Sequence, residues 1–356
     1  MPKIKVAILY GGKSAEHDVS VNSAKTIYSL IDKKKYSVFT IYITRQGLWF
    51  IQKLGVTKET HLPAAVSMGG KYNLISQDGK KFRQKIDVFI PMLHGPYGED
   101  GTVQGMFEML NTAYVGCDVL SSSIGMDKII CKQLVKNLKI PVLKHVVIEN
   151  EKNINYKNVL GKVKKLGLPV FVKPNSMGSS VGITKVIKQQ HLKSAIAKAF
   201  KYDSQIYIEK AVDNAREIVC AVLGSKLSAK ASVCGEIVVL TRQFYDYESK
   251  YVDATSHKLV MPAKISKKLS DQIRKTSVEI FKTLKCSGLA RIDFFIKKGT
   301  DRFYFCEINT IPGFTEHSLY PNLWKKTGTA PRKLVEELIN TALKEHSLKQ
   351  KTSLSL

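Results

Sequence analysis

The feature that most constrains this chain is a pair of neighbouring apolar segments that carry polar residues at alternate positions. The segments read LARIDFFI and RFYFCEIN, and they place Arg291 two residues before Asp293 and Glu307 two residues before Asn309. Side chains two apart on a strand point to the same face, so each segment is predicted to be a strand with its polar pair on one side. If the two strands pair, two carboxylates and an amide converge beside one guanidinium.

This polar face predicts a site for Mg²⁺ and phosphate. Mg²⁺ binds one or two carboxylates and takes its other ligands from phosphate groups and water. The alternative is a polar strand face exposed to solvent. The flanking residues are too apolar for that, and a glycine-containing loop from Ile311 to Phe314 follows at once. We therefore interpret Asp293, Glu307 and Asn309 as metal ligands.

Composition indicates an ordinary globular protein of two or three domains. The chain has 356 residues, 44% hydrophobic and 24% charged, which is long for one core. It contains no run of 18 apolar residues, so no membrane span is expected. The opening MPKIKVAILYGG does not resemble a signal peptide, and the six cysteines are scattered without zinc-site spacing. We expect a cytoplasmic protein with reduced thiols.

The formal net charge of +26 raises the alternative of a nucleic-acid-binding protein. The lysines are spread along the whole chain and far outnumber the arginines, and no basic stripe interleaved with aromatic residues stands out. That distribution favours solvated surface over base recognition. We therefore expect no nucleic-acid partner, whereas anionic substrates agree with the charge.

The amino-terminal third reads as an α/β unit. An apolar strand from Ile4 to Leu9 ends in two glycines, and apolar residues at helical spacing follow between Val21 and Ile31. Strands are predicted at 36–43 and 88–93, and the second ends in the loop His94 to Gly101. Ligands bind at the carboxyl ends of strands in such sheets, so His94 is a candidate site residue.

The remaining elements are predicted more coarsely. The character of the sequence shifts around residues 121–125, where three serines lead into the helix expected near Met126. Residues 149–158 are expected to be a loop, and the tail after Glu345 is expected to be frayed. Helices are predicted at 103–110, from about 126, and at 191–200, 269–284 and 332–343. Strands are predicted at 170–174, 181–186 and 205–209, and strands predominate from there to about 310.

A small-residue loop, Asn175 to Ser180, lies between two of the predicted strands. With Lys173 beside it, the loop offers backbone N–H groups and hydroxyls to phosphate oxygens. Because a strand and not a helix follows, it is neither a P-loop nor a dinucleotide-binding turn. A hairpin lid over phosphates is one interpretation, and an ordinary hairpin of small residues is the other.

Other candidates are weaker when taken one at a time. Lys128 near a helix start could be a surface charge, and Glu209 at a strand end could bind hydroxyls or cap the strand. The polar and aromatic segment 242–251 suggests a loop that closes over a site, or else an amphipathic surface loop. Gly313 permits close approach of its N–H to an oxyanion, and Ser318 could bind a carboxylate.

In this order, the segments resemble the D-alanine–D-alanine ligases of the ATP-grasp superfamily, from Val6 to about residue 335. The motifs that carry the resemblance are GGKSAEHDVS, LHGPYGEDGTVQG, GCDVLSSSIGMDK, FVKPNSMGSSVGITKV, YDYESKY and EINTIPGFTEHSLYP. The resemblance implies an α/β (α+β) fold of three domains that begins with an open parallel sheet. The expected domains are 1–122 for the first substrate, 123–211 and 212–350 for ATP and catalysis, and 351–356 as a frayed tail.

The resemblance also implies where ATP and metal bind. ATP would lie between the central and carboxy-terminal domains, and two Mg²⁺ ions, with Mn²⁺ as an alternative, would bind Asp293, Glu307 and Asn309. Residues 213–217 are one residue longer than in some relatives, which affects the assignment of Glu217. The residues implied to contact the nucleotide are Lys128, Lys173, Gly178, Ser180, Glu209 and Glu217.

For the amino acids, the resemblance implies two D-alanine molecules per turnover. Glu16 would bind the first ammonium group and would be linked through Tyr251 to Ser179. Arg291 and the Gly313 N–H would stabilise the tetrahedral intermediate. The residues implied for the remaining substrate contacts are His94, Lys250, Ser318 and Leu319.

The implied reaction joins two D-alanines through an acyl phosphate, as a step of peptidoglycan precursor synthesis. Relatives that make the D-lactate ester have Phe where this chain has Tyr251, and relatives that prefer D-serine often have Arg where it has Leu319. Both residues favour the dipeptide over D-lactate or D-serine as second substrate. The family also implies a homodimer.

Overall fold

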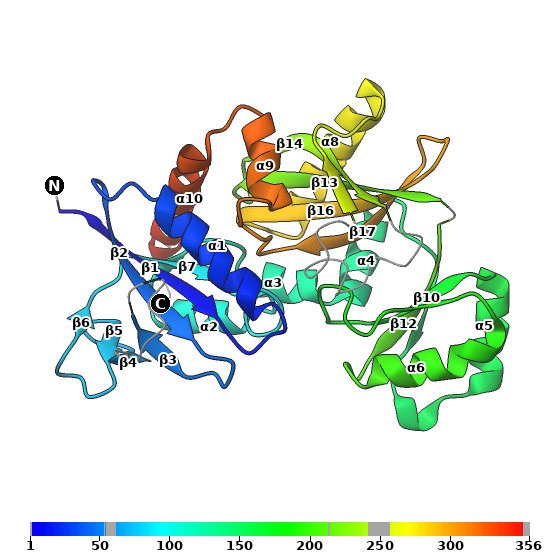
Figure 1. The fold of residues 1–356 in the computed structure, drawn as a ribbon, viewed down its shortest axis with the longest axis horizontal. Helices are drawn as coiled ribbons and strands as arrows, with labels where there is room; N and C mark the ends of the chain where they lie inside the picture. The colour runs from blue at the N-terminus through cyan, green and yellow to red at the C-terminus, as the bar shows by residue number, and fades with distance from the viewer. Residues whose placement is uncertain (1, 53, 55–61, 213, 241–256, 352–356) are drawn as a thin grey trace.

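The computed structural model describes residues 2–52, 54, 62–212, 214–240 and 257–351. Three sheets follow one another along the chain, each with helices packed against it (Figure 1). The mixed α/β architecture that begins with a parallel sheet is thereby confirmed. Among the helices of these residues, none is both long enough and apolar enough to cross a membrane.

The first sheet has the strand order β6-β5-β4-β3-β2-β1-β7-β8. Its parallel part confirms the predicted strands, whereas no strand was predicted in its short antiparallel extension. The parallel strands are β1 (Ile4–Gly11), β2 (Tyr36–Ile43), β7 (Val88–Met92) and β8 (Ala113–Tyr114). The extension consists of β3 (Trp49–Ile51), β4 (Leu62–Val66), β5 (Leu74–Ser76) and β6 (Arg83–Gln84).

Strand β1 is apolar throughout because both of its faces are covered. Alternate side chains point to opposite faces: Val6 and Ile8 pack with α1 (His17–Leu30) and α10 (Pro331–Gln350), and Ala7 and Leu9 pack with α2 (Thr102–Met109). Helix α10 comes from the other end of the chain and lies beside α1 (Figure 1). The first sheet therefore shares a core with the carboxy-terminal part.

The prediction of a frayed tail after Glu345 is wrong as far as Gln350, because α10 continues to that residue. The helix begins at Pro331, a favourable first helical residue. Its last turn is held by side chains of the first sheet's unit: Lys349 bonds Glu108, and Gln350 exchanges hydrogen bonds of 2.5 and 3.2 Å with Asn111.

Two further segments differ in part from the prediction, which had a helix starting near Met126 and a loop at 149–158. Residues 121–123 lie within α3 (Val119–Met126), whose first turn is capped by Asp118, and a second helix, α4 (Lys128–Asn137), follows the cap Asp127. The loop predicted at 149–158 is confirmed only in part, because it contains a short 3₁₀ turn at Glu151–Asn153 and the start of α5 (Tyr156–Leu166), capped by Asn155. The sequence offers such Asp and Asn residues equally to turns and to helix starts.

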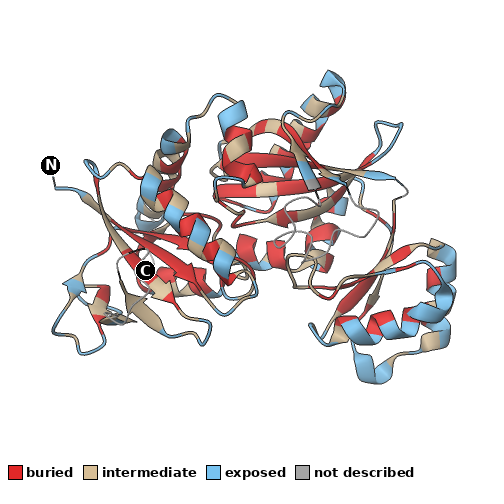
Figure 2. Ribbon diagram, in the orientation of Figure 1, coloured by how far each residue is buried: buried red, intermediate tan, exposed pale blue. Residues whose placement is uncertain are grey.

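The central sheet is antiparallel, in the order β11-β10-β12-β9. Its strands are β9 (His145–Ile148), β10 (Val170–Pro174), β11 (Thr184–Val186) and β12 (Ile206–Lys210). Helices α5 and α6 (Leu192–Phe200) cover one face, and their outer sides are exposed (Figure 2). Because β10 pairs with β11, the loop Asn175 to Ser180 joins two strands of a hairpin, as predicted.

The third sheet has the order β15-β14-β13-β16-β17 and is packed against α8 (Lys267–Thr283). Its strands are β13 (Ala215–Gly224), β14 (Ala229–Val239), β15 (His257–Val260), β16 (Gly288–Lys297) and β17 (Phe303–Asn309). β16 and β17 pair with Arg291 opposite Asn309 and Asp293 opposite Glu307. The predicted pairing of the two polar strand faces is confirmed.

Candidate active site

Two adjoining cavities gather most of the predicted site residues. A cavity of about 660 Å³ lies between the central and third sheets, and a smaller one of about 140 Å³ reaches the first sheet's loops. They share Ser179, Glu217 and Glu307 as lining residues. The larger cavity is also lined by Lys128, Lys173, Ser180 and Glu209. The smaller is also lined by Glu16, His94, Gly178, Arg291, Asn309, Gly313 and Leu319.

The polar face of β16 and β17 lies between these cavities. Arg291 donates from Nε to Asp293 Oδ1 at 2.8 Å and from Nη2 to Oδ2 at 2.7 Å, and Asn309 Nδ2 lies 3.1 Å from the same Oδ2. Asp293 is almost fully buried. Burial acts to lower the pKa of Arg291, but the charge of Asp293 and its hydrogen bonds outweigh this effect. The net shift of the pKa is upward, so the guanidinium keeps its charge.

The donor set of this face suits Mg²⁺. Two carboxylates, Asp293 and Glu307, stand opposite each other across the strand pair, and the Asn309 amide is beside them. No group of three or more His, Cys, Asp or Glu side chains within the described ranges could hold a metal ion. A cation here would therefore need further oxygen ligands, which phosphate groups and water supply to Mg²⁺.

A buried triad forms the floor of the larger cavity. Glu209 accepts from Lys173 Nζ at 2.6 Å and lies 3.0 Å from Lys132 Nζ. Burial acts to raise the pKa of Glu209, but the two lysines lower it to about 2, so the group is a carboxylate. Glu209 thereby fixes the ammonium of Lys173 at the cavity wall.

Lys132 was not predicted as a site residue. Its ammonium also donates to the Cys306 carbonyl at 2.7 Å, so it joins the triad to the strand that carries Glu307. The sequence feature that could have identified Lys132 is its position four residues after Lys128 on one helix, since residues at that spacing share a face.

Lys128 connects the hairpin loop to the predicted metal strand. It is the first residue of α4, and its Nζ donates to the Met177 carbonyl at 2.8 Å and lies 3.6 Å from Glu307 Oε2. The side chain is 11% exposed. The alternative of a free surface lysine is therefore wrong.

The hairpin loop reaches across to the first sheet's unit. Ser179 Oγ donates to Glu16 Oε1 at 2.5 Å, and a Cβ at Gly178 would lie 3.4 Å from Glu16 Oε2. Ser179 and Ser180 have φ of +52° and +62°, a left-handed conformation that costs about 1–3 kcal/mol per residue. This contact places the hairpin loop beside Glu16, which lines the smaller cavity.

The loop after β17 completes the smaller cavity. A Cβ at Gly313 would lie 3.0 Å from Ser318 Oγ, so the glycine permits the close packing of these two residues. The Ser318 hydroxyl accepts from the Thr315 N–H at 2.9 Å, and Leu319 is mostly buried beside it. Gly313 and Ser318 are thus adjacent.

Two predicted residues cannot be placed. Lys250 and Tyr251 lie outside the described residues, so the predicted link from Glu16 through Tyr251 to Ser179 stays a prediction. The structure does show a direct hydrogen bond from Ser179 to Glu16.

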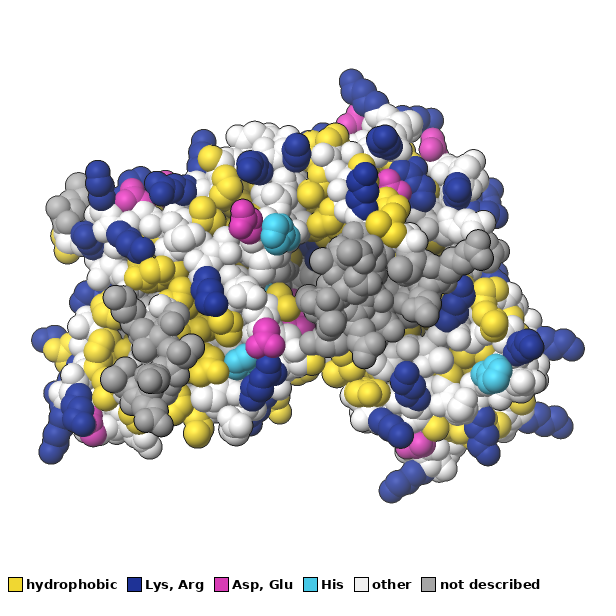
Figure 3. All heavy atoms as spheres, in the orientation of Figure 1, with side chains coloured by type: hydrophobic (Ala, Val, Ile, Leu, Met, Phe, Trp, Pro, Cys, Tyr) yellow, Lys and Arg dark blue, Asp and Glu magenta, His cyan; other side chains and the backbone are white. Residues whose placement is uncertain are grey.

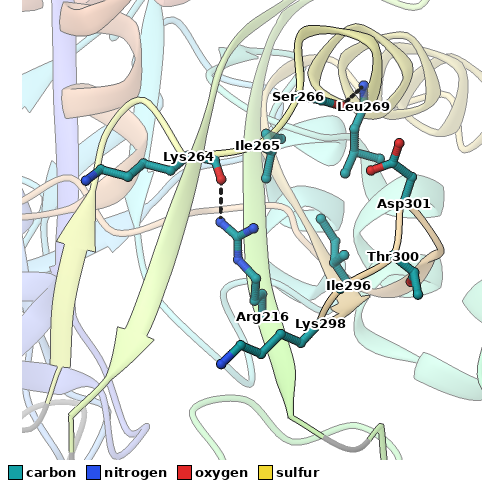
Figure 4. A pocket seen from close by; sticks show the side chains of 10 residues that line it. Arg216, Lys264, Ile265, Ser266, Leu269, Ile296, Lys298, Thr300 and Asp301 are labelled. Carbon is teal, nitrogen blue, oxygen red and sulfur yellow. Dashed lines mark hydrogen bonds between the residues drawn. The ribbon is translucent and has the colours of Figure 1, made fainter.

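A further cavity, of about 740 Å³, opens on the far end of the third sheet (Figure 4). One of its cationic residues, Arg216, is already paired: Nε and Nη2 each donate to Glu236 at 2.7 Å, and Nη2 donates to the Lys264 carbonyl at 2.8 Å. None of the predicted site residues lines it. Its size therefore does not make it a candidate.

Among the described residues on the face seen in Figure 3, no concentrated basic patch is visible. Lysine and arginine side chains are scattered over that face among neutral and apolar ones. This distribution agrees with the expectation from the sequence that the charge of +26 reflects solvated lysines.

Comparison with known proteins agrees with the geometry. The family model "D-ala D-ala ligase N-terminus" matches residues 5–117, and "D-ala D-ala ligase C-terminus" matches residues 134–340. The D-alanine--D-alanine ligase of Thermoanaerobacter sp. (strain X514) is 41% identical and covers 98% of this chain and 99% of its own. D-alanine--D-alanine ligase A of Escherichia coli (strain K12) is 40% identical, with 98% of each chain covered.

Solved structures give the same result. The D-alanine-D-alanine ligase from Coxiella burnetii has a TM-score of 0.86 at 31% identity and covers 99% of this chain and 97% of its own. The VanG D-Ala:D-Ser ligase from Enterococcus faecalis has a TM-score of 0.83 at 35% identity, covering 96% and 100%. The chain therefore belongs to the D-alanine–D-alanine ligase family, within the ATP-grasp fold.

Proposed function

We propose that this protein joins two D-alanines to D-alanyl-D-alanine, converting ATP to ADP and phosphate, for peptidoglycan precursor synthesis. Family membership over nearly the full chain supports this activity. The observation that carries it is the arrangement of the two adjoining cavities: a lysine-lined cavity suited to a nucleotide meets a smaller one lined by Glu16, Arg291 and Gly313.

ATP would occupy the larger cavity. Lys128, Lys173 and the hairpin loop with Gly178 and Ser180 would contact the phosphates, and Glu209 and Glu217 the ribose and adenine side. Mg²⁺, as two ions or with Mn²⁺ as an alternative, would be held by Asp293, Glu307 and Asn309 and would neutralise phosphate charge.

The amino acids would occupy the smaller cavity. The carboxylate of the first D-alanine, its ammonium held by Glu16, attacks the γ-phosphorus; the acyl phosphate forms as the bond to ADP breaks. The neutral amine of the second D-alanine then attacks the acyl carbon and releases one proton. Arg291 and the Gly313 N–H stabilise the tetrahedral oxyanion, and phosphate leaves as the peptide bond forms.

The direct test supplies the protein with ATP and Mg²⁺ together with D-alanine, L-alanine, D-lactate or D-serine. Phosphate release is measured and products are identified by mass. We expect dipeptide from D-alanine alone. Mixed products with D-lactate or D-serine would contradict the specificity, and no turnover with any of them would contradict the function.

Replacing Tyr251 by phenylalanine is expected to shift product toward the D-alanine–D-lactate ester when both second substrates are present. The support for this prediction is that the ester-forming relatives which this chain resembles have Phe at the position of Tyr251. The measurement is the ratio of ester to dipeptide by mass. An unchanged ratio would contradict the role of Tyr251.

A D-serine-using ligase is the second candidate, because the VanG D-Ala:D-Ser ligase is among the similar structures. Leu319, where such relatives often carry Arg, favours D-alanine. A homodimer and a cytoplasmic location are proposed from the family resemblance. A nucleic-acid-binding role would instead require tight, salt-sensitive binding without need for Asp293, Glu307 and Asn309.

A further inference from the structure

The loop that carries Gly313 is held by side chains from the first sheet's unit. His94 Nδ1 lies 2.9 Å from the Ile311 carbonyl oxygen, and the Ile311 N–H donates to Glu99 Oε1 at 3.0 Å. The N–H and the carbonyl group of Ile311 are therefore both hydrogen-bonded by a segment more than 200 positions earlier in the chain.

A third contact holds the other end of the same loop. The Phe314 N–H donates to Ser23 Oγ at 3.1 Å, and this oxygen lies 3.2 Å from His94 Nε2. Ser23 and Phe314 are fully buried and His94 is 4% exposed, so water does not compete for these bonds. Gly313 lies between the two anchored residues, Ile311 and Phe314.

The hydrogen-bond roles form one consistent chain. Because His94 Nδ1 faces a carbonyl, that nitrogen carries the proton, and Nε2 accepts from the Ser23 hydroxyl. Burial lowers the pKa of His94, which agrees with this neutral form. Both ring nitrogens are thus engaged by protein atoms. If His94 contacts substrate, as predicted from the sequence, only its ring carbons are available for that contact.

Glu99 accepts hydrogen bonds from the backbone of both loops. Its Oε2 accepts from the Gly95 N–H at 2.9 Å while Oε1 accepts from Ile311, so the carboxyl joins the loop of the first unit to the loop after β17. A Cβ at Gly95 would lie 3.1 Å from Glu16 Oε2, so Glu16 lies against the loop that carries Glu99. Burial, followed by the charge of Glu16, raises the pKa of Glu99 to about 8.

We propose that Ser23, His94 and Glu99 are positioning residues that fix the Gly313 amide at the developing oxyanion. This inference rests on the proposed function. Oxyanion donors act only when held at the place where charge develops, and a misplacement of about 1 Å can cost about 10²-fold in rate. The anchoring also makes the catalytic geometry depend on how the first unit docks on the third sheet.

Glu99→Gln tests the proposal because it keeps the size of the side chain. An amide offers one acceptor oxygen, so its NH₂ must face either Gly95 N–H or Ile311 N–H. Ser23→Ala is the second variant, since it removes the acceptor of Phe314 N–H. Glu108→Gln is the matched control: Glu108 belongs to the same unit, bonds Tyr114 and Lys349, and lines neither of the two active-site cavities.

We expect kcat for dipeptide formation to fall about 10- to 100-fold in both variants. KM for ATP and the affinity for ADP should stay within about twofold, because the nucleotide cavity is untouched. Affinity for a tetrahedral phosphinate analogue of the dipeptide should fall with kcat. Because both residues act on one loop, their double variant should lose less than the product of the single losses.

Two results would overturn the proposal. One is a folded Glu99→Gln and Ser23→Ala with kcat within about threefold of the unchanged protein. The other is a loss of kcat accompanied by a similar fold-loss of ADP affinity and by a lower thermal midpoint. That combination would indicate general destabilisation. If Glu99→Gln does not fold, Ser23→Ala decides. An unchanged protein that makes no dipeptide would contradict the proposed function instead.

Discussion

Replacing Arg291 by methionine is expected to lower kcat for D-alanyl-D-alanine formation by about 10²- to 10³-fold. The guanidinium lines the smaller cavity and is only 19% exposed, so its charge is little screened by water. It also forms a two-bond fork with Asp293, which would become a buried carboxylate without this partner. The loss therefore combines weaker oxyanion stabilisation with a disturbed metal face.

Arg291→Lys separates these contributions. Lysine keeps a positive charge but cannot reproduce the planar fork to Asp293, so we expect an intermediate kcat. Arg302→Met is the matched control, because Arg302 is exposed near the start of β17 in the same hairpin and should change kcat less than twofold. Steady-state phosphate release with D-alanine gives kcat. A value for Arg291→Met within threefold of the unchanged protein would exclude Arg291 from the chemistry.

The polar face of the third sheet could be predicted because the alternation of side chains on a strand is fixed by geometry. Arg291, Asp293, Glu307 and Asn309 required only that two apolar segments pair in register, and they do. Adjacent turn and loop residues such as Gly313 and Ser318 were also within reach. Short-range patterns of this kind do not depend on the rest of the fold.

Partners far apart in the sequence could not be predicted in the same way. Lys132 looked like one of many lysines, and only the docking of α4 against β12 and β17 buries it beside Glu209. His94 could be placed at a strand end, but its bond to Ile311 spans 217 positions. The strands β3 to β6 have two to five residues each, too few for a periodic signal.

Replacing Glu209 by glutamine is expected to lower the free energy of unfolding at pH 7 by about 3–5 kcal/mol. The carboxylate is 1% exposed and is shared by the ammonium groups of Lys132 and Lys173, which are 1% and 10% exposed. Removing its charge leaves two buried ammonium groups near each other. Glu336→Gln is the control, because its ion pair with Lys35 is exposed and screened by water, so its loss should change the stability little.

The stabilisation by Glu209 should also depend on pH in a defined direction. Its pKa is lowered from 4.5 to about 2 in the folded protein, so between these values the unfolded chain binds more protons. Stability therefore rises with pH through this window, is fully present above 4.5, and is lost as pH falls toward 2. Urea unfolding of the unchanged protein and Glu209→Gln at pH 3, 5 and 7 measures it. The difference between the two should be equal at pH 5 and 7 and smaller at pH 3; a difference independent of pH would show that Glu209 is not the charged centre of the triad.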